Sequence, residues 1–144
     1  MEKSKLGISI NFFSALLFFL GAAGGVLVIM IAAGYVLLFE KNNKLKKTAI
    51  KALILIVCLV IIATLISWIT NLLSIILNSY SIYNSNPDVH YSYNIFQFSQ
   101  FIPQNIDFLM RIFQILIPAI FGFRVYKEKE IKIKWIDNIL DEHF

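Results

Sequence analysis

The fold of this chain is decided by residues 6–63, LGISINFFSALLFFLGAAGGVLVIMIAAGYVLLFEKNNKLKKTAIKALILIVCLVIIA. An uncharged apolar run over residues 6–39 leads into a lysine-rich turn at residues 40–51, and a second apolar run begins at Ala52. Two apolar segments of membrane-spanning length, joined by so short a basic turn, are expected to run in opposite directions through a bilayer. The stretch therefore predicts a transmembrane helical hairpin over residues 1–78.

The composition of the chain indicates the same class of protein. Of its 144 residues, 58% are hydrophobic and 15% are charged, and the net charge is +4. A soluble domain of this size cannot bury so much apolar surface, so we expect an all-α integral membrane protein. Because the basic residues flank the apolar runs, a phospholipid membrane is favoured as the partner over nucleic acid.

The first apolar run is longer than one crossing requires. As a straight helix, residues 6–39 would reach about 51 Å, against a hydrocarbon core of about 30 Å. The run must therefore tilt, kink or protrude, and the candidate positions for a bend are its glycines, Gly21, Gly24, Gly25 and Gly34. The small residues near Ala23 imitate a signal-peptide cleavage site, but the run continues to Phe39, which favours an uncleaved first span.

The predicted helix-packing residues lie in both apolar runs. Gly21 and Gly25 form a G-x-x-x-G pair, with Gly34 as a further small residue, and such surfaces let two helices approach closely in lipid. The alternative is that small residues are simply common in spans. In the second run a polar stripe recurs at steps of three and four residues: Thr64, Ser67, Asn71 and Ser74. We expect this polar stripe to hold helices together, and the alternative is that it lines a pore.

The turn at residues 40–51 carries the densest positive charge in the chain. Its lysines are Lys41, Lys44, Lys46, Lys47 and Lys51. The positive-inside rule places this turn in the cytoplasm. We expect the lysines to bind lipid headgroup phosphates; the alternative is that they only orient the hairpin.

The second half of the chain predicts an outer loop and a third span. Residues 79–105 are rich in Tyr, Asn and Ser and hold no Lys or Arg, which indicates an extracytoplasmic loop. Within it, the alternation of Phe96 and Phe98 predicts a short strand. A third transmembrane helix is predicted over residues 106–126, with a bend at Pro118.

The charges of the third span and the tail bear on topology. Asp107 and Arg111 are four residues apart, which favours an ion pair at the outer membrane boundary; alternatively, Arg111 lies deeper and marks a polar pathway. Residues 127–144 predict a short, basic amphipathic helix on the cytoplasmic surface or against a partner. The expected topology is a multi-pass protein of the cell membrane with its N-terminus outside and its C-terminus in the cytoplasm.

Motifs for catalysis are absent from the sequence. The chain has no G-x-S-x-G, H-E-x-x-H, C-x-x-C or phosphate-binding glycine loop, and it has two histidines. No nucleophile, base and orienting group can be assembled from these residues. We therefore expect no enzymatic activity, no metal site and no cofactor.

Residues 21–73 resemble the small pilin family of type IV secretion and conjugation systems. In that family a helix rich in small residues meets a short lysine-bearing loop and returns as an aliphatic helix with a polar or aromatic end. The corresponding residues here are Ala33, Gly34, Lys44, Lys46, Lys47, Ala49 and residues 68–71. The resemblance implies a membrane-stored subunit that polymerises into a tubular filament, with the loop lysines meeting phospholipid headgroups in its lumen.

The chain departs from the pilin pattern in its third span and its tyrosine-rich outer segment. These additions favour a membrane-resident structural or channel subunit of the same kind of apparatus, acting as a homo-oligomer or within a membrane-protein complex. Two alternatives stay open. Three spans and a charged tail also suit a holin-like pore-former, and residues 117–130, IPAIFGFRVYKEKE, look like the basic tail of membrane-embedded coat proteins of archaeal spindle-shaped viruses, which favours a viral envelope or coat protein.

Overall fold

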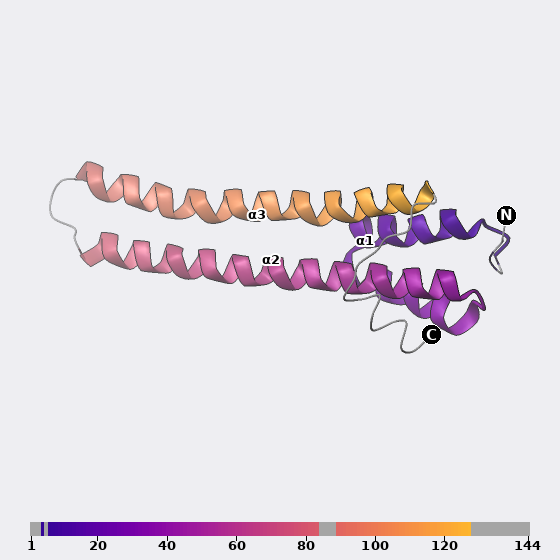
Figure 1. Ribbon diagram of the computed structural model, residues 1–144. Helices are drawn as coiled ribbons and strands as arrows, with labels where there is room; N and C mark the ends of the chain where they lie inside the picture. The colour runs from indigo at the N-terminus through magenta and orange to yellow at the C-terminus, as the bar shows by residue number, and fades with distance from the viewer. Residues whose placement is uncertain (1–3, 5, 84–88, 128–144) are drawn as a thin grey trace. The chain divides into compact units, whose positions relative to one another are not determined.

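The structure is a computed structural model that describes Ser4 and residues 6–83 and 89–127 of the chain. It contains three helices, α1 (Ile10–Phe39), α2 (Asn43–Tyr83) and α3 (Val89–Tyr126) (Figure 1). Each helix includes a stretch that is long and apolar enough to cross a membrane. The predicted fold class, an all-α protein with three such helices, is confirmed.

Helix α1 is folded in two at Gly25. The backbone of Gly25 has φ 70° and ψ −164°, a conformation that is essentially restricted to glycine. A Cβ atom added to Gly21 would lie 3.6 Å from the Cβ atom of Ile29. Residues eight apart in a straight helix are separated by about 12 Å, so the two halves of α1 must lie against each other.

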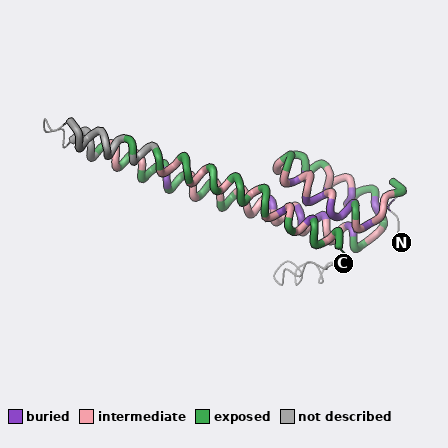
Figure 2. The backbone as a smooth tube through the Cα atoms, turned by 90° about the horizontal axis from the view of Figure 1, so that it is seen from above, coloured by how far each residue is buried: buried purple, intermediate pink, exposed green. Residues whose placement is uncertain are grey.

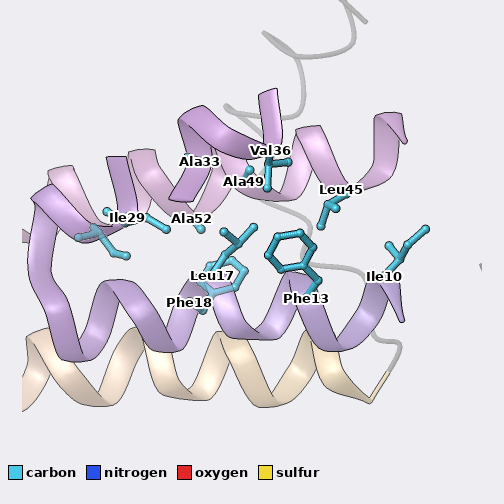
Figure 3. Close-up of a cluster of buried hydrophobic side chains, with 11 residues drawn as sticks. Ile10, Phe13, Leu17, Phe18, Ile29, Ala33, Val36, Leu45, Ala49 and Ala52 are labelled. Atoms are coloured by element: carbon cyan, nitrogen blue, oxygen red, sulfur yellow. The ribbon is translucent and has the colours of Figure 1, made fainter. Parts of the chain in front are cut away.

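The two halves of α1 are here named the first arm, residues 10–24, and the second arm, residues 26–39. In Figure 3, the first arm carries Leu17 and Phe18, and the second arm runs alongside it and carries Ile29 and Ala33. Four glycines were candidates for a bend in this run, and the structure places the bend at Gly25. The excess length of the apolar run is thus taken up by folding back.

Side-chain N-caps mark the starts of the first two helices. The Ser9 side chain accepts a hydrogen bond from the backbone N–H of Phe12 at the start of α1. At the start of α2, the backbone N–H of Leu45 donates to Asn42 Oδ1 at 3.2 Å. Because α2 begins immediately after Asn42, four of the five lysines of the predicted turn lie on the helix itself.

The chain divides into two compact units. Unit 1 comprises Met1–Leu59 and Gln114–Phe144, and unit 2 comprises Val60–Phe113. The buried residues, purple in Figure 2, belong mainly to unit 1. Its apolar core joins both arms of α1 to the first turns of α2, and its members are Ile10, Phe13, Leu17, Phe18, Ile29, Ala33, Val36, Leu45, Ala49, Ala52 and Ile56.

Within unit 1, the last turns of α3 pack on the first arm of α1. Three aromatic pairs line this contact: Phe12 with Tyr126, Phe18 with Phe121, and Phe19 with Phe123. Offset and edge-to-face aromatic pairs add to the apolar contact they make. The contact therefore brings the start of α1 next to the end of α3.

Unit 2 is a pair of helical segments, residues 60–83 of α2 and 89–113 of α3. Among its residues whose side chains are described, Thr70 alone is buried. Large apolar side chains are exposed on residues 60–79 of α2 and 101–113 of α3, including Trp68 at 67% and Phe108 at 63%. In a bilayer, such side chains face lipid or another protein.

The segment expected to be an outer loop is largely helical. Within residues 79–105, α2 continues to Tyr83 and α3 begins at Val89, so the short strand expected near Phe96 is not formed. Extending an existing helix adds one hydrogen bond per residue, and this outweighs the weak strand signal of two alternating phenylalanines. Helix α3 also continues through Pro118, which is buried in unit 1. The tail helix expected over residues 127–144 lies, apart from Lys127, outside the described residues.

Candidate membrane-embedded and helix-packing sites

The lysines of the predicted turn lie where α2 enters unit 1. Lys41 and Lys44 are exposed, whereas Lys46, Lys47 and Lys51 are half-buried. On the same turns of α2, Leu45, Ala49 and Ala52 face the core, at steps of four and three residues. The first turns of α2 thus present an apolar stripe to α1 and place the lysines away from it. This arrangement leaves the exposed amines accessible to lipid headgroups.

Of the three glycines predicted to pack helices, only Gly21 lies at a close contact among the described residues. Gly21 is buried, and a Cβ atom added there would overlap the side chain of Ile56 on α2. Gly25 has nothing within 4 Å of its added Cβ and forms the bend of α1, and Gly34 likewise meets open space. Because Gly25 is not helical, Gly21 and Gly25 do not form a continuous G-x-x-x-G face. Gly21 makes a close helix contact within the chain itself.

Gly122 is a helix-packing residue that the sequence did not reveal. A Cβ atom added to it would lie 3.3 Å from the backbone oxygen of Ala15 and 3.3 Å from Cβ of Phe18. Such spacing is tighter than ordinary van der Waals contact, so α3 approaches α1 closely because this position has no side chain. A lone glycine between two phenylalanines was the available signal, but nothing in the sequence showed which helix would face it.

The polar stripe of α2 is incompletely satisfied by this chain. Thr64 donates a hydrogen bond to the carbonyl oxygen of Val60 at 2.8 Å, within its own helix. In the described part of the chain, the side chains of Ser67, Asn71 and Ser74 make no hydrogen bond, and Asn71 is exposed. Thr70, which lies beside the stripe, is buried, and its hydroxyl donates a hydrogen bond to the backbone oxygen of Ser67 at 3.0 Å. The stripe is therefore open to a neighbour.

The two charged residues predicted to pair on α3 do not pair. Asp107 is half-buried and Arg111 is exposed, and over the described residues neither side chain makes an ion pair. The position of Arg111 in the membrane stays a prediction.

Exposed apolar surface defines the class of the protein. On the second arm of α1, the exposed fractions of Leu27, Ile31 and Leu38 are 76%, 75% and 80%. Side chains of this size and exposure, on three helices of membrane-spanning length, require lipid around them. The chain is a multi-pass helical membrane protein. No protein-family model matches it, and no curated protein or solved structure shows significant similarity to it.

Proposed function

We propose that this protein is a self-associating structural or channel subunit of a pilin-like secretion or DNA-transfer apparatus. The observation that carries self-association is the Asn71 side chain, an exposed amide of α2 with no hydrogen bond among the described residues. In lipid, an unsatisfied amide is costly, and a second helix that supplies a partner removes this cost. The polar stripe, with Asn71 at its centre, is the proposed contact between copies.

The packing around the lysine turn supports the pilin-like part of the proposal. Ala33 and Val36 on the second arm of α1 share a core with Leu45 and Ala49 on α2, across a turn of three residues. A short lysine-bearing turn between a helix rich in small residues and an aliphatic helix is the feature that the resemblance rests on. The second arm has 14 residues, however, because it begins only after the bend at Gly25.

The proposal also includes lipid binding by the lysines and the direction in which the chain is inserted into the membrane. Lys41 and Lys44 are exposed and positioned to contact phospholipid headgroups, and the positive-inside rule places the lysine turn and the C-terminal tail in the cytoplasm. The protein would then reside in the cell membrane as a homo-oligomer or within a larger membrane complex.

Self-association is tested by replacing the amide. In mild detergent or in vesicles, Asn71→Leu is expected to lower the association constant about 3-fold to 20-fold, the range that interhelical hydrogen bonds of about 0.6 to 1.7 kcal/mol allow. The matched control is Asn105→Leu, because the Asn105 amide already donates to Phe101 O of its own helix. A parent protein that stays monomeric at high concentration would contradict the proposal, as would equal effects of the two variants.

The alternative functions predict different behaviour of the same material. A holin-like pore-former makes vesicles leak a trapped dye and damages cells on expression, whereas a viral envelope or coat protein co-purifies with particles. Oligomers that form without leakage or particles support the structural subunit. Dye release that is lost in Asn71→Leu would assign the polar stripe to a pore instead.

A further inference from the structure

We propose that α1 enters and leaves the bilayer from the face that carries the lysine turn, as a re-entrant hairpin bent at Gly25. Only α2 and α3 then cross the membrane. The residues before Ile10 lie on the same side as the lysine turn, and not opposite to it as expected from the sequence. The partner of the outer surface of α1 is the lipid acyl layer that the hairpin enters from that face. This inference does not depend on the proposed self-association.

The length of the two arms is the first support. The arms of α1 have 15 and 14 residues, or about 22 Å and 21 Å of helix, which is less than the hydrocarbon thickness of about 30 Å. Neither arm crosses the bilayer alone. The bend is confined to Gly25, so the helical backbone is interrupted at one place within the membrane.

The positions of the helix ends in unit 1 are the second support. In Figure 3, Ile10 at the start of α1 lies at the same end of the core as Leu45 at the start of α2, whereas Ile29, near the bend, lies at the other end. The contact of Phe12 with Tyr126 brings the end of α3 to the start of α1 as well. The start of α1, the start of α2 and the end of α3 therefore share one end of unit 1.

The distribution of basic residues is the third support. Of the 13 Lys and Arg residues, all but Arg111 lie in residues 1–9, 40–51 and 124–134. In the re-entrant arrangement all three segments are on one side of the membrane, and residues 79–105, with no Lys or Arg, are on the other. A crossing α1 would place Lys3 and Lys5 opposite the remaining lysines. The positive-inside rule favours the re-entrant arrangement.

The bend also predicts how the topology can be changed. The backbone angles of Gly25 are strained for any residue with a side chain, so Gly25→Ala favours a continuous helix. A continuous α1 of 30 residues, about 45 Å long, can cross the bilayer and would carry the preceding residues to the other face. Gly34→Ala is the matched control, since Gly34 is helical and an added Cβ atom meets nothing within 4 Å.

The test uses single cysteines in a Cys58→Ala background, because Cys58 is the one natural cysteine. The full chain carries Glu2→Cys, Lys41→Cys or Asn86→Cys, and sealed cells and inverted vesicles are treated with a membrane-impermeant maleimide. Glu2→Cys and Lys41→Cys are expected to react from the same side, and Asn86→Cys from the opposite side. Labelling of Glu2→Cys together with Asn86→Cys would overturn the proposal.

The second step compares the two glycine variants in the Glu2→Cys background. Gly25→Ala is expected to shift Glu2→Cys labelling toward the side of Asn86→Cys, whereas Gly34→Ala leaves it unchanged. If Gly25→Ala fails to accumulate in the membrane, the comparison of the three cysteines in the parent chain still decides the topology. Unchanged labelling in a well-inserted Gly25→Ala protein would refute the role assigned to the bend.

Discussion

The rings of Phe12 and Tyr126 meet edge to face, with their centroids 6.5 Å apart, although 113 residues separate them in the chain. One ring belongs to the first turn of α1 and the other to the last residue of α3. Within the described part of unit 1, the contact joins the first helical segment of the chain to the last. Substitutions along this contact therefore test whether α1 and α3 pack against each other in unit 1.

Gly122→Ala is expected to destabilise the protein by about 1 to 3 kcal/mol, the usual cost of overpacking a close contact. The added Cβ atom would meet the backbone oxygen of Ala15 at 3.3 Å, and a backbone atom cannot move aside as a side chain can. The measurement is thermal or denaturant-induced unfolding in detergent. The control is Gly34→Ala, the same substitution at a glycine where an added Cβ atom meets nothing within 4 Å. Equal stability of the two variants would show that α3 does not pack here.

Gly21→Ala is expected to lower the free energy of unfolding by about 1 to 3 kcal/mol. Shortening the Ile56 side chain should recover part of this loss of stability. The atom that an alanine would overlap is the end of the Ile56 side chain, which is flexible. A double-mutant cycle of Gly21→Ala and Ile56→Val measures the coupling in the same unfolding assay. Additive effects would contradict the direct contact between α1 and α2.

Phe18→Ala is expected to lower stability by about 2 kcal/mol or more, because it leaves a cavity in a fully buried site that touches Phe121. The matched control is Phe108→Ala, since the Phe108 side chain is 63% exposed and lipid or detergent can fill the space it leaves. Unfolding of the two variants in the same detergent provides the comparison. A larger loss for Phe108→Ala than for Phe18→Ala would be incompatible with this core.

Asn42→Ala is expected to lower the stability of the protein by about 1 kcal/mol, the typical value for loss of a helix N-cap. Its side-chain oxygen accepts a hydrogen bond from the backbone N–H of Leu45 at 3.2 Å, at the start of α2. The neighbouring Asn43→Ala is the control, because Asn43 is exposed and already within the helix. Hydrogen exchange of the first turn of α2 should rise in the Asn42 variant and not in the control.

The membrane class was predictable because length and apolar composition are local properties of a segment. The bend at Gly25 was foreseen as one of four candidates, but sequence could not choose between them. The choice depends on the packing of Ile29 against Gly21, which exists only after the chain has folded back. The same holds for Gly122, whose role depends on the helix opposite it. Composition was misleading for residues 79–105, where helix extension outweighed loop-like residues.

The bend at Gly25 also bears on how the chain is inserted into a bilayer. In the proposed re-entrant arrangement, the amino-terminal lysines never have to be translocated. The insertion machinery has to move across the membrane only residues 79–105, the end of α2, the start of α3 and the connection between them, which contain one Asp and no Lys or Arg. Folding one apolar segment back on itself thus reduces the number of charged residues that must be translocated across the bilayer during insertion.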